Sequence, residues 1–187
     1  MDLDSINIAS YFFEGKKELD IESNLLSAKV NGNYLLSEIP NSALFYLSKY
    51  LPNYIKSNQR IAADQDVNFN IKTRKVNDLI MAFSDVISGF DNSSFVGNLN
   101  SQKQSLSLVS AIPYGKIGNV KLFNSSIEGV GDYSKLNVKT SIDKLIVGNN
   151  MLNTSLSLDA TVAQDEINYT LISKSDEQYG TATVSGN

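Results

Sequence analysis

The sequence predicts a mainly β protein built on one extended antiparallel sheet. From about Phe95 onward, short segments that alternate apolar and polar residues follow one another, with turn-forming residues between them. The alternation is one-sided: in "SLSLDATV" the residues Leu156, Leu158 and Val162 share one face of the strand, and the residues between them are mostly small and polar. Such a sheet has a continuous aliphatic face that must be covered. From the residues alone, three kinds of cover stay open: a second sheet in a closed β-sandwich, a fold of the same sheet over itself, or an apolar ligand.

Short strands are expected over residues 1–39, and a helix is expected over 41–57. The pair Asn31-Gly32 favours a type I′ turn and predicts a hairpin at that point. In the helix, apolar residues recur at helical spacing after Asn41 and Ser42, either of which can cap its start. Pro52 is expected to end or kink the helix.

A second amphipathic helix is expected over residues 74–90, after a strand in "DVNFNIK". Its apolar stripe falls at spacings of three and four residues, and Gly89 is expected to help end it. The stripe consists of Val76, Leu79, Ile80, Phe83, Val86, Ile87 and Phe90. Residues 94–187 follow as a β-meander, so the chain 1–187 is expected to form a single β-rich domain.

The composition excludes several classes of function. The formal net charge of −4 and the absence of a basic stripe argue against a nucleic-acid partner. The sequence has no histidine and no cysteine, so catalytic triads and the commonest zinc and haem ligands are missing. Close pairs of carboxylates lie in polar turns or at strand edges, where solvation explains them. No phosphate-binding or nucleophile-elbow motif occurs. We expect no enzyme activity, no catalytic residue, no metal and no cofactor.

The aliphatic face of the predicted sheet is the candidate binding site. Acyl chains could lie along it, because each CH₂ removed from water contributes about 0.8 kcal/mol. The candidate groove residues are the apolar members of the alternating segments: Leu106, Leu108, Val120, Leu122, Leu136, Val138, Ile142, Leu152, Leu156, Leu158, Val162, Ile167, Tyr169 and Leu171.

Several phrases of the sequence resemble a known family. The segments "NGNYLLSEIP", "LSKYLPNYI", "NFNIKTRKVNDLIMAF" and "LSLVSAIPYGKIGNVKLFN", followed by a run of short strands, are similar to the TamB-like translocation and assembly module proteins, in particular their Bacteroidetes branch, and to the wider AsmA-like proteins. The resemblance covers most of the chain from about Lys29 onward, and none of its phrases is a catalytic signature.

The resemblance implies a fold and a role. Family members are longer, with an inner-membrane helix and a periplasmic body of β-strands rolled into a taco-like groove. The resemblance therefore implies that the extended antiparallel sheet of this chain curls into such a groove, with a closed β-sandwich as the alternative. It also implies that the chain is a fragment of a longer envelope protein attached to the inner membrane through an anchor absent from the chain. It implies that the groove holds phospholipid or another acyl-chain lipid. It also implies an Omp85-type outer-membrane protein as partner, with a role in phospholipid transport or outer-membrane protein assembly.

The sequence also leaves a second class of function open. A closed β-sandwich would use the same aliphatic residues as its core, and the chain would then be a non-catalytic binding or scaffold domain of a secreted or surface protein. The two helices and the polar segment "SKSDEQYG" do not contribute to a groove, which leaves a plug or a cap as their role.

Overall fold

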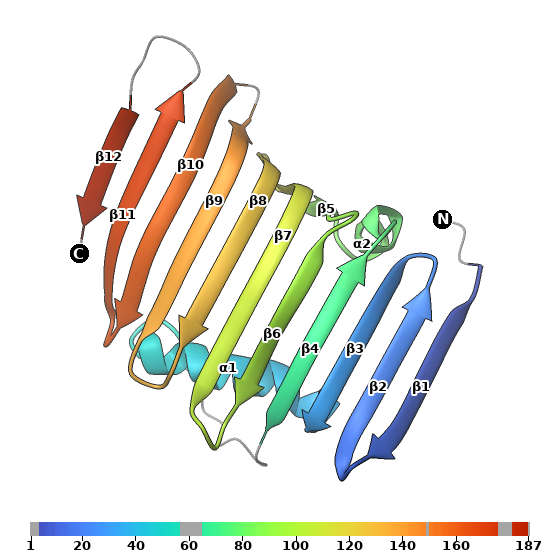
Figure 1. Cartoon of the computed structure of the whole chain (residues 1–187). Coiled ribbons are helices and arrows are strands. Elements are labelled where there is room, and N and C mark those ends of the chain that lie inside the picture. The colour runs from blue at the N-terminus through green and yellow to red at the C-terminus, as the bar shows by residue number, and fades with distance from the viewer. Residues whose placement is uncertain (1–3, 57–64, 149, 176–180, 187) are drawn as a thin grey trace.

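The computed structural model describes residues 4–56, 65–148, 150–175 and 181–186, with only the backbone described at 150–154, at 175 and at 181–186. One antiparallel sheet dominates the described part of the chain (Figure 1). The strands are β1 (Ile6–Phe13), β2 (Lys16–Ser23), β3 (Leu26–Asn33), β4 (Asp66–Thr73), β5 (Ile87–Gly89), β6 (Ser94–Asn100), β7 (Ser105–Ile117), β8 (Val120–Gly131), β9 (Leu136–Val147), β10 (Asn150–Ala163), β11 (Glu166–Ser175) and β12 (Thr181–Gly186).

The strands lie side by side in one layer. Their order is β1-β2-β3-β4-β6-β7-β8-β9-β10-β11-β12, and the short strand β5 pairs with the end of β7. The sheet is open, with β1 and β12 as its edges (Figure 1). The expected extended antiparallel sheet is therefore confirmed. The alternative of a closed β-sandwich is wrong, because the strands do not divide into two facing sheets.

Two helices accompany the sheet: α1 (Ile39–Tyr50), preceded by the 3₁₀ turn Leu36–Glu38, and α2 (Asn77–Phe83). In Figure 1, α1 crosses behind the sheet near one end of the strands, and α2 lies at the opposite end.

The first helix packs on the sheet through tyrosines. Tyr46 is fully buried in a core with Tyr34, Val67 and Leu99, and its hydroxyl donates a 2.7 Å hydrogen bond to the carbonyl of Asn100. This bond satisfies the phenol, which would otherwise be costly to bury. The helix is thereby fixed to the ends of β4 and β6.

The far end of α1 is held by the turn between β10 and β11. The backbone N–H of Asp165 donates to the carbonyl of Tyr50, and the Asp165 carboxylate accepts hydrogen bonds from the backbone and side-chain amides of Asn53, at 2.9 and 2.7 Å. The helix therefore spans the strands from the end of β3 to the turn before β11. It links two parts of the sheet that are far apart in the sequence.

The first predicted helix, over residues 41–57, is shorter than expected and starts earlier. It begins at Ile39, with Pro40 in its first turn, where the missing proline N–H needs no partner. It ends at Tyr50, close to the predicted end before Pro52. The residues after Leu51 form turns, and residue 57 lies outside the described residues.

The second predicted helix, over residues 74–90, is wrong in its second half. The helix ends at Phe83, and the hydroxyl of Ser84 accepts hydrogen bonds from the N–H groups of Val86 and Ile87. Residues 87–89 then pair with β7. The reason lies in β7, which continues to Ile117 although its pairing with β6 stops at Ala111. The exposed backbone groups of β7 gain partners when this segment is extended.

The predicted hairpin at Asn31-Gly32 is also wrong, because both residues lie inside β3. Gly32 has a φ of +136°, and a Cβ at this position would lie 1.9 Å from the carbonyl oxygen of Asp66. The glycine is needed because β4 approaches closely, and not because the chain turns there. The β1–β2 turn falls instead at Glu14-Gly15, between those two strands.

Tyr50 is expected to make the free energy of unfolding fall at alkaline pH. Burial, together with the smaller contributions of the charges of Asp132 and Tyr133, raises the pKa of Tyr50 to about 12. In the unfolded chain the pKa is about 10. The folded protein therefore keeps a proton that the unfolded chain loses, so this contribution is complete below pH 10 and is lost as the pH rises through about 12.

We predict that the free energy of unfolding falls between pH 8 and pH 11 and that Tyr50→Phe reduces this fall by about 1 kcal/mol. Urea unfolding at the two pH values measures it. Near pH 8 the variant should stay within about 1 kcal/mol of the wild type, because the hydroxyl has no hydrogen-bond partner in the described part of the chain. An unchanged fall in the variant would contradict this role of Tyr50.

Candidate apolar ligand-binding face

Strand pairing assigns most of the predicted groove residues to one face of the sheet. Residues directly opposite each other on neighbouring strands point to the same side. Pairs such as Leu158 with Leu171 and Val138 with Ala160 therefore continue one apolar face from strand to strand. The predicted residues on this face are Leu106, Leu108, Leu136, Val138, Ile142, Leu156, Leu158, Val162, Ile167, Tyr169 and Leu171.

Val120 and Leu122 were assigned to the groove by the sequence, and this is wrong. Leu122 is opposite Gly115 on β7 and Leu145 on β9, which point to the other face of the sheet. The prediction was wrong because β8 has apolar residues on both of its faces. Phe123 and Ile127 are the ones that lie on the apolar face of the sheet. The side chain of Leu152 lies outside the described residues, so its face is not assigned.

The sequence prediction also missed residues of the first half of the chain. On β4, Phe69 and Ile71 point to the apolar face, and their partners on β6 continue it across to β7. The alternation in "DVNFNIK" marked this segment as a strand, but its place beside β6 was not evident. The pairing of β1 to β4 extends the face further, through Ile8, Leu19, Ile21, Ala28, Val30 and Val67. The missed residues on the other strands and on β4 are Phe69, Ile71, Phe95, Leu99, Ile112, Phe123 and Ile127.

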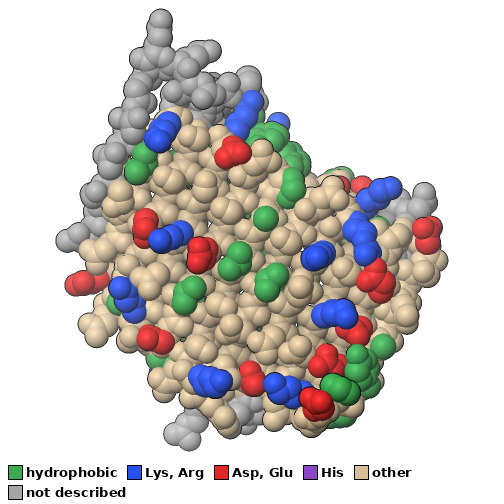
Figure 2. Space-filling view, in the orientation of Figure 1, with side chains coloured by type: hydrophobic (Ala, Val, Ile, Leu, Met, Phe, Trp, Pro, Cys, Tyr) green, Lys and Arg blue, Asp and Glu red, His purple; other side chains and the backbone are tan. Residues whose placement is uncertain are grey.

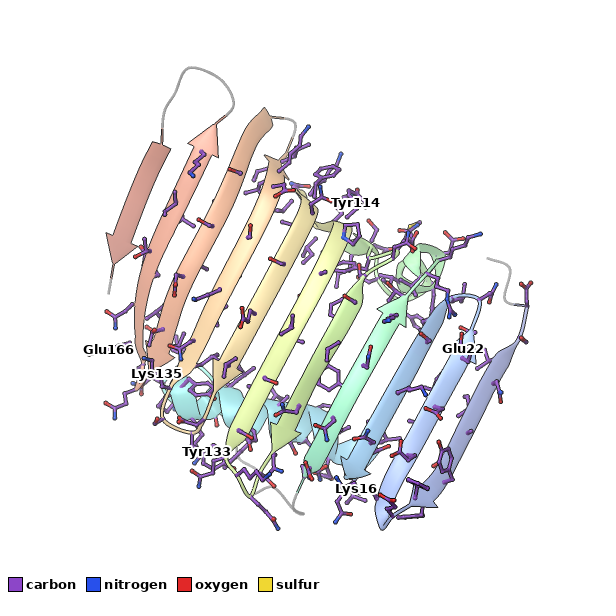
Figure 3. The ribbon with its side chains drawn as sticks, viewed as in Figure 1. Lys16, Glu22, Tyr114, Tyr133, Lys135 and Glu166 are labelled. Atoms are coloured by element: carbon purple, nitrogen blue, oxygen red, sulfur yellow. The ribbon has the colours of Figure 1, made fainter. Side chains whose placement is uncertain are left out.

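Helix α1 covers one end of the apolar face, which we call the helix end. Leu99, Leu106 and Val67 contact its tyrosines or the residues packed against them. The ring of Tyr133 lies 4.9 Å from that of Tyr46, centroid to centroid, and closes the same end. In Figure 3, the labelled Tyr133 lies beside α1, while Tyr114 lies at the opposite end of the strands, which we call the open end.

Between these two ends the face is lined mainly by aliphatic side chains, with Ser110, Ser125 and Thr140 among them. We call this region the apolar strip. A Cβ built on Gly129, in the middle of the strip on β8, would meet no atom within 4 Å, whereas one on Gly131 would lie 2.6 Å from the Tyr50 hydroxyl oxygen. The cover by α1 therefore ends between these two glycines. The strip consists of Leu108, Ile112, Ile127, Val138, Ile142 and Leu158.

Several side chains in the strip are shielded from water although no helix covers them. Ile112 and Ile142 are buried, and Ser110 and Ser125 beside them are only 3% and 5% exposed. No helix covers them, so side chains of the neighbouring strands on the same face provide this shielding. The hydroxyls of both serines have no hydrogen-bond partner among the described residues. Such buried, unpaired groups cost free energy.

The open end of the face carries aromatic rings and ammonium groups. The rings of Tyr114 and Phe123 are paired across β7 and β8, with centroids 5.1 Å apart. The amino group of Lys144 lies 5.8 Å from the centroid of the Phe123 ring. Lys116 and Lys121 are directly opposite each other one step further along the same face. The face is thus apolar in its middle and positively charged at one end.

The opposite face of the sheet is polar. Figure 2 shows it with lysine, arginine, aspartate and glutamate side chains interspersed among uncharged polar ones, and with few hydrophobic side chains. The exposed hydrophobics on the central strands of this face are Val96, Val109, Val130, Ile117 and Val147. Two shallow hollows on this side are lined mainly by charged and polar residues, such as Asp20 and Lys29 in one and Glu128 in the other. This face resembles an ordinary solvated strand surface.

The described residues contain no group of three or more acidic side chains placed to hold a metal ion. In the same part of the chain, neither helix has the length and hydropathy that crossing a membrane requires. No protein-family model, no curated protein and no solved structure matches the chain.

The two glycines on either side of the edge of α1, Gly131 and Gly129, provide a matched pair of variants. Gly131→Ala should lower the free energy of unfolding by about 1–3 kcal/mol, because the added Cβ collides with the Tyr50 hydroxyl and with the carbonyl of Lys135, at 2.6 and 2.8 Å. Gly129→Ala should leave it unchanged or raise it by up to about 1 kcal/mol, since the site is open and glycine weakens a strand. Urea unfolding compares the two, and equal effects would show that α1 does not end where we place it.

Proposed function

We propose that this chain is a non-catalytic module that holds the acyl chains of lipids on its apolar face, between α1 and the open end of the sheet. The observation that carries the proposal is the apolar strip, which is aliphatic on four neighbouring strands and open above Gly129. No helix covers the strip, and its side chains are buried or half-buried. Apolar surface that the rest of the fold leaves uncovered often marks a binding site. A hydrocarbon chain matches this surface in both shape and polarity.

The dimensions of the strip suit a lipid tail. From Tyr114 to Leu108 the strand advances six residues, which is about 20 Å at about 3.3 Å per residue. The hydrocarbon of a bilayer is about 30 Å thick, so the chains of one leaflet extend about 15 Å. A single acyl chain can therefore lie along a strand between the open end and the side of α1.

The physics of such binding needs no reactive residue. Each CH₂ that leaves water contributes about 0.8 kcal/mol, so a short run of methylenes already gives measurable affinity. The strip offers a surface that takes these groups without a covalent step. This agrees with a chain that contains neither histidine nor cysteine.

In its wider setting, we propose that the chain is a segment of a periplasmic, bridge-like envelope protein attached to the inner membrane. Its role would be to support phospholipid transport or outer-membrane protein assembly, with an Omp85-type outer-membrane protein as partner. The support for this setting is the resemblance of the sequence to the TamB-like family, together with the apolar strip. An open sheet suits it, because further strands can pair with the edges β1 and β12.

Neighbouring residues of β7 provide the test. Leu108 points to the apolar strip, between Gly97 on β6 and Gly129 on β8, and Val109 points to the polar face, where it is 54% exposed. Leu108→Glu should abolish uptake of a fluorescent acyl-chain probe, because it puts a charge where the chain lies. Val109→Glu should leave uptake within about twofold of the wild type, since its side chain stays in water.

Circular dichroism of both variants checks that they fold. The open site above Gly129 leaves room for the glutamate of Leu108→Glu, so we expect a folded protein without uptake. If the variant folds and takes up the probe as well as the wild type does, the strip is not the binding surface. Unfolding of Leu108→Glu alone would show that the strip is a closed core, and this too would contradict the proposal.

A further inference from the structure

The open end of the apolar face carries a group of three lysines. Lys116 on β7 and Lys121 on β8 are directly opposite each other, and Lys144 on β9 is opposite Phe123, next to them. All three side chains point to the apolar face and are only partly exposed. None of them forms an ion pair with an acidic residue in the described part of the chain.

Two other lysines of the sheet lie beside acidic partners. On the polar face, Lys139 is opposite Glu128 and Asp159, with its amino group 4.0 Å from the Asp159 carboxylate. Lys29 is opposite Asp20, at 3.9 Å. These pairs follow the usual rule that opposite charges face each other across strands. The lysines of the open end break this rule, in a protein whose net charge is negative.

Two like charges directly opposite each other on a sheet destabilise it. The cost is larger when the groups are partly removed from water, because screening by solvent is then weaker. An anion between Lys116 and Lys121 would turn this repulsion into attraction. The arrangement thus has the positive charge of an anion site, and it has no acidic partner among the described residues.

The position of the lysines specifies the kind of anion. Immediately next to them on the same face are the rings of Tyr114 and Phe123, and then the aliphatic side chains of the apolar strip. Beside the strip, Ser125 holds a buried hydroxyl without a partner, which an ester carbonyl could accept from. A molecule that matches this order carries a negative charge at one end and hydrocarbon at the other.

We propose that the three lysines bind the phosphate of an anionic phospholipid whose acyl chains lie on the apolar strip and point toward α1. The inference rests on the proposed function and adds to it the class of lipid and its orientation. The phosphate accepts hydrogen bonds from the ammonium groups of Lys116 and Lys121. Lys144 completes the site from the side of β9.

The test compares three probes on the delipidated full chain. Dioleoyl phosphatidylglycerol carries both charge and tails, dioleoylglycerol carries only tails, and inorganic phosphate carries only charge. Native mass spectrometry measures the binding of the two lipids, and phosphorus NMR measures that of phosphate. The variants are Lys116→Gln/Lys121→Gln and the single Lys121→Gln, with Lys29→Gln/Lys139→Gln as the polar-face control.

We expect the wild type to bind phosphatidylglycerol at least about tenfold more tightly than dioleoylglycerol, because hydrogen bonds to charged groups discriminate by at least this factor. The double variant should lose this preference and bind dioleoylglycerol unchanged, and the control should behave as the wild type does. The melting temperatures of the open-end variants should equal or exceed that of the wild type, because their repulsion is relieved.

The failures are distinguishable. Equal binding of both lipids to the wild type overturns the headgroup site and leaves acyl-chain binding in place. A preference that survives in both open-end variants also overturns the site. Inorganic phosphate bound as tightly as phosphatidylglycerol assigns the lysines to a free anion and not to a lipid. If neither lipid binds to the wild type, the proposed function itself fails, and the lipid site fails with it.

Discussion

The fold depends on how one layer of antiparallel strands covers its apolar face. A sheet with one dry and one wet face is stable only if something shields the dry side. Here α1 provides that shield at one end, through Tyr46 and Tyr50, and it is held in place by Tyr34 at one extremity and by Asp165 at the other. The helix thus connects β3 and β4 with the β10–β11 turn. The rest of the apolar face has no helix over it.

This division of the apolar face explains the site. Beyond Gly131 the strip has no helix over it, and neighbouring side chains on the same face keep Ile112 and Ile142 away from water. A ligand that replaces water here needs only to be apolar along the strip and anionic near Lys121. The unpaired hydroxyls of Ser110 and Ser125 and the unpaired lysines are both costs in the free protein. A bound lipid would remove part of these costs, which is the arrangement expected where function competes with stability.

Much of this architecture could be predicted from the alternation of residues. Segments such as residues 155–162 have apolar residues at one parity only, so their apolar face is evident without knowledge of their neighbours. The residues of β8 are different, because Leu122 and Phe123 are both apolar and only the register with β7 and β9 decides which one faces the strip. Pairing register between strands is a property of the whole sheet, and a period of two within one strand does not contain it.

The prediction of a helix over residues 74–90 was wrong in its second half for a related reason. Its spacing fits a helical stripe as far as Phe90, but β7 needs a partner for Gly115–Ile117, and this need for pairing is not visible in the local sequence. The placement of the lysines of the open end on the apolar face could not be predicted for the same reason. Lys116 and Lys121 lie on either side of the Gly118 turn, and only the register of the hairpin puts them on the apolar face.

The most direct test of the account is photo-crosslinking in bacterial cells at two neighbouring positions of β8. A benzophenone amino acid at Gly129 would extend over the apolar strip, and the same amino acid at Val130 would extend from the polar face. The account predicts a phospholipid adduct at Gly129, found by mass spectrometry, and none at Val130. Equal labelling at both positions, or no lipid adduct at Gly129 in the folded protein, would contradict it.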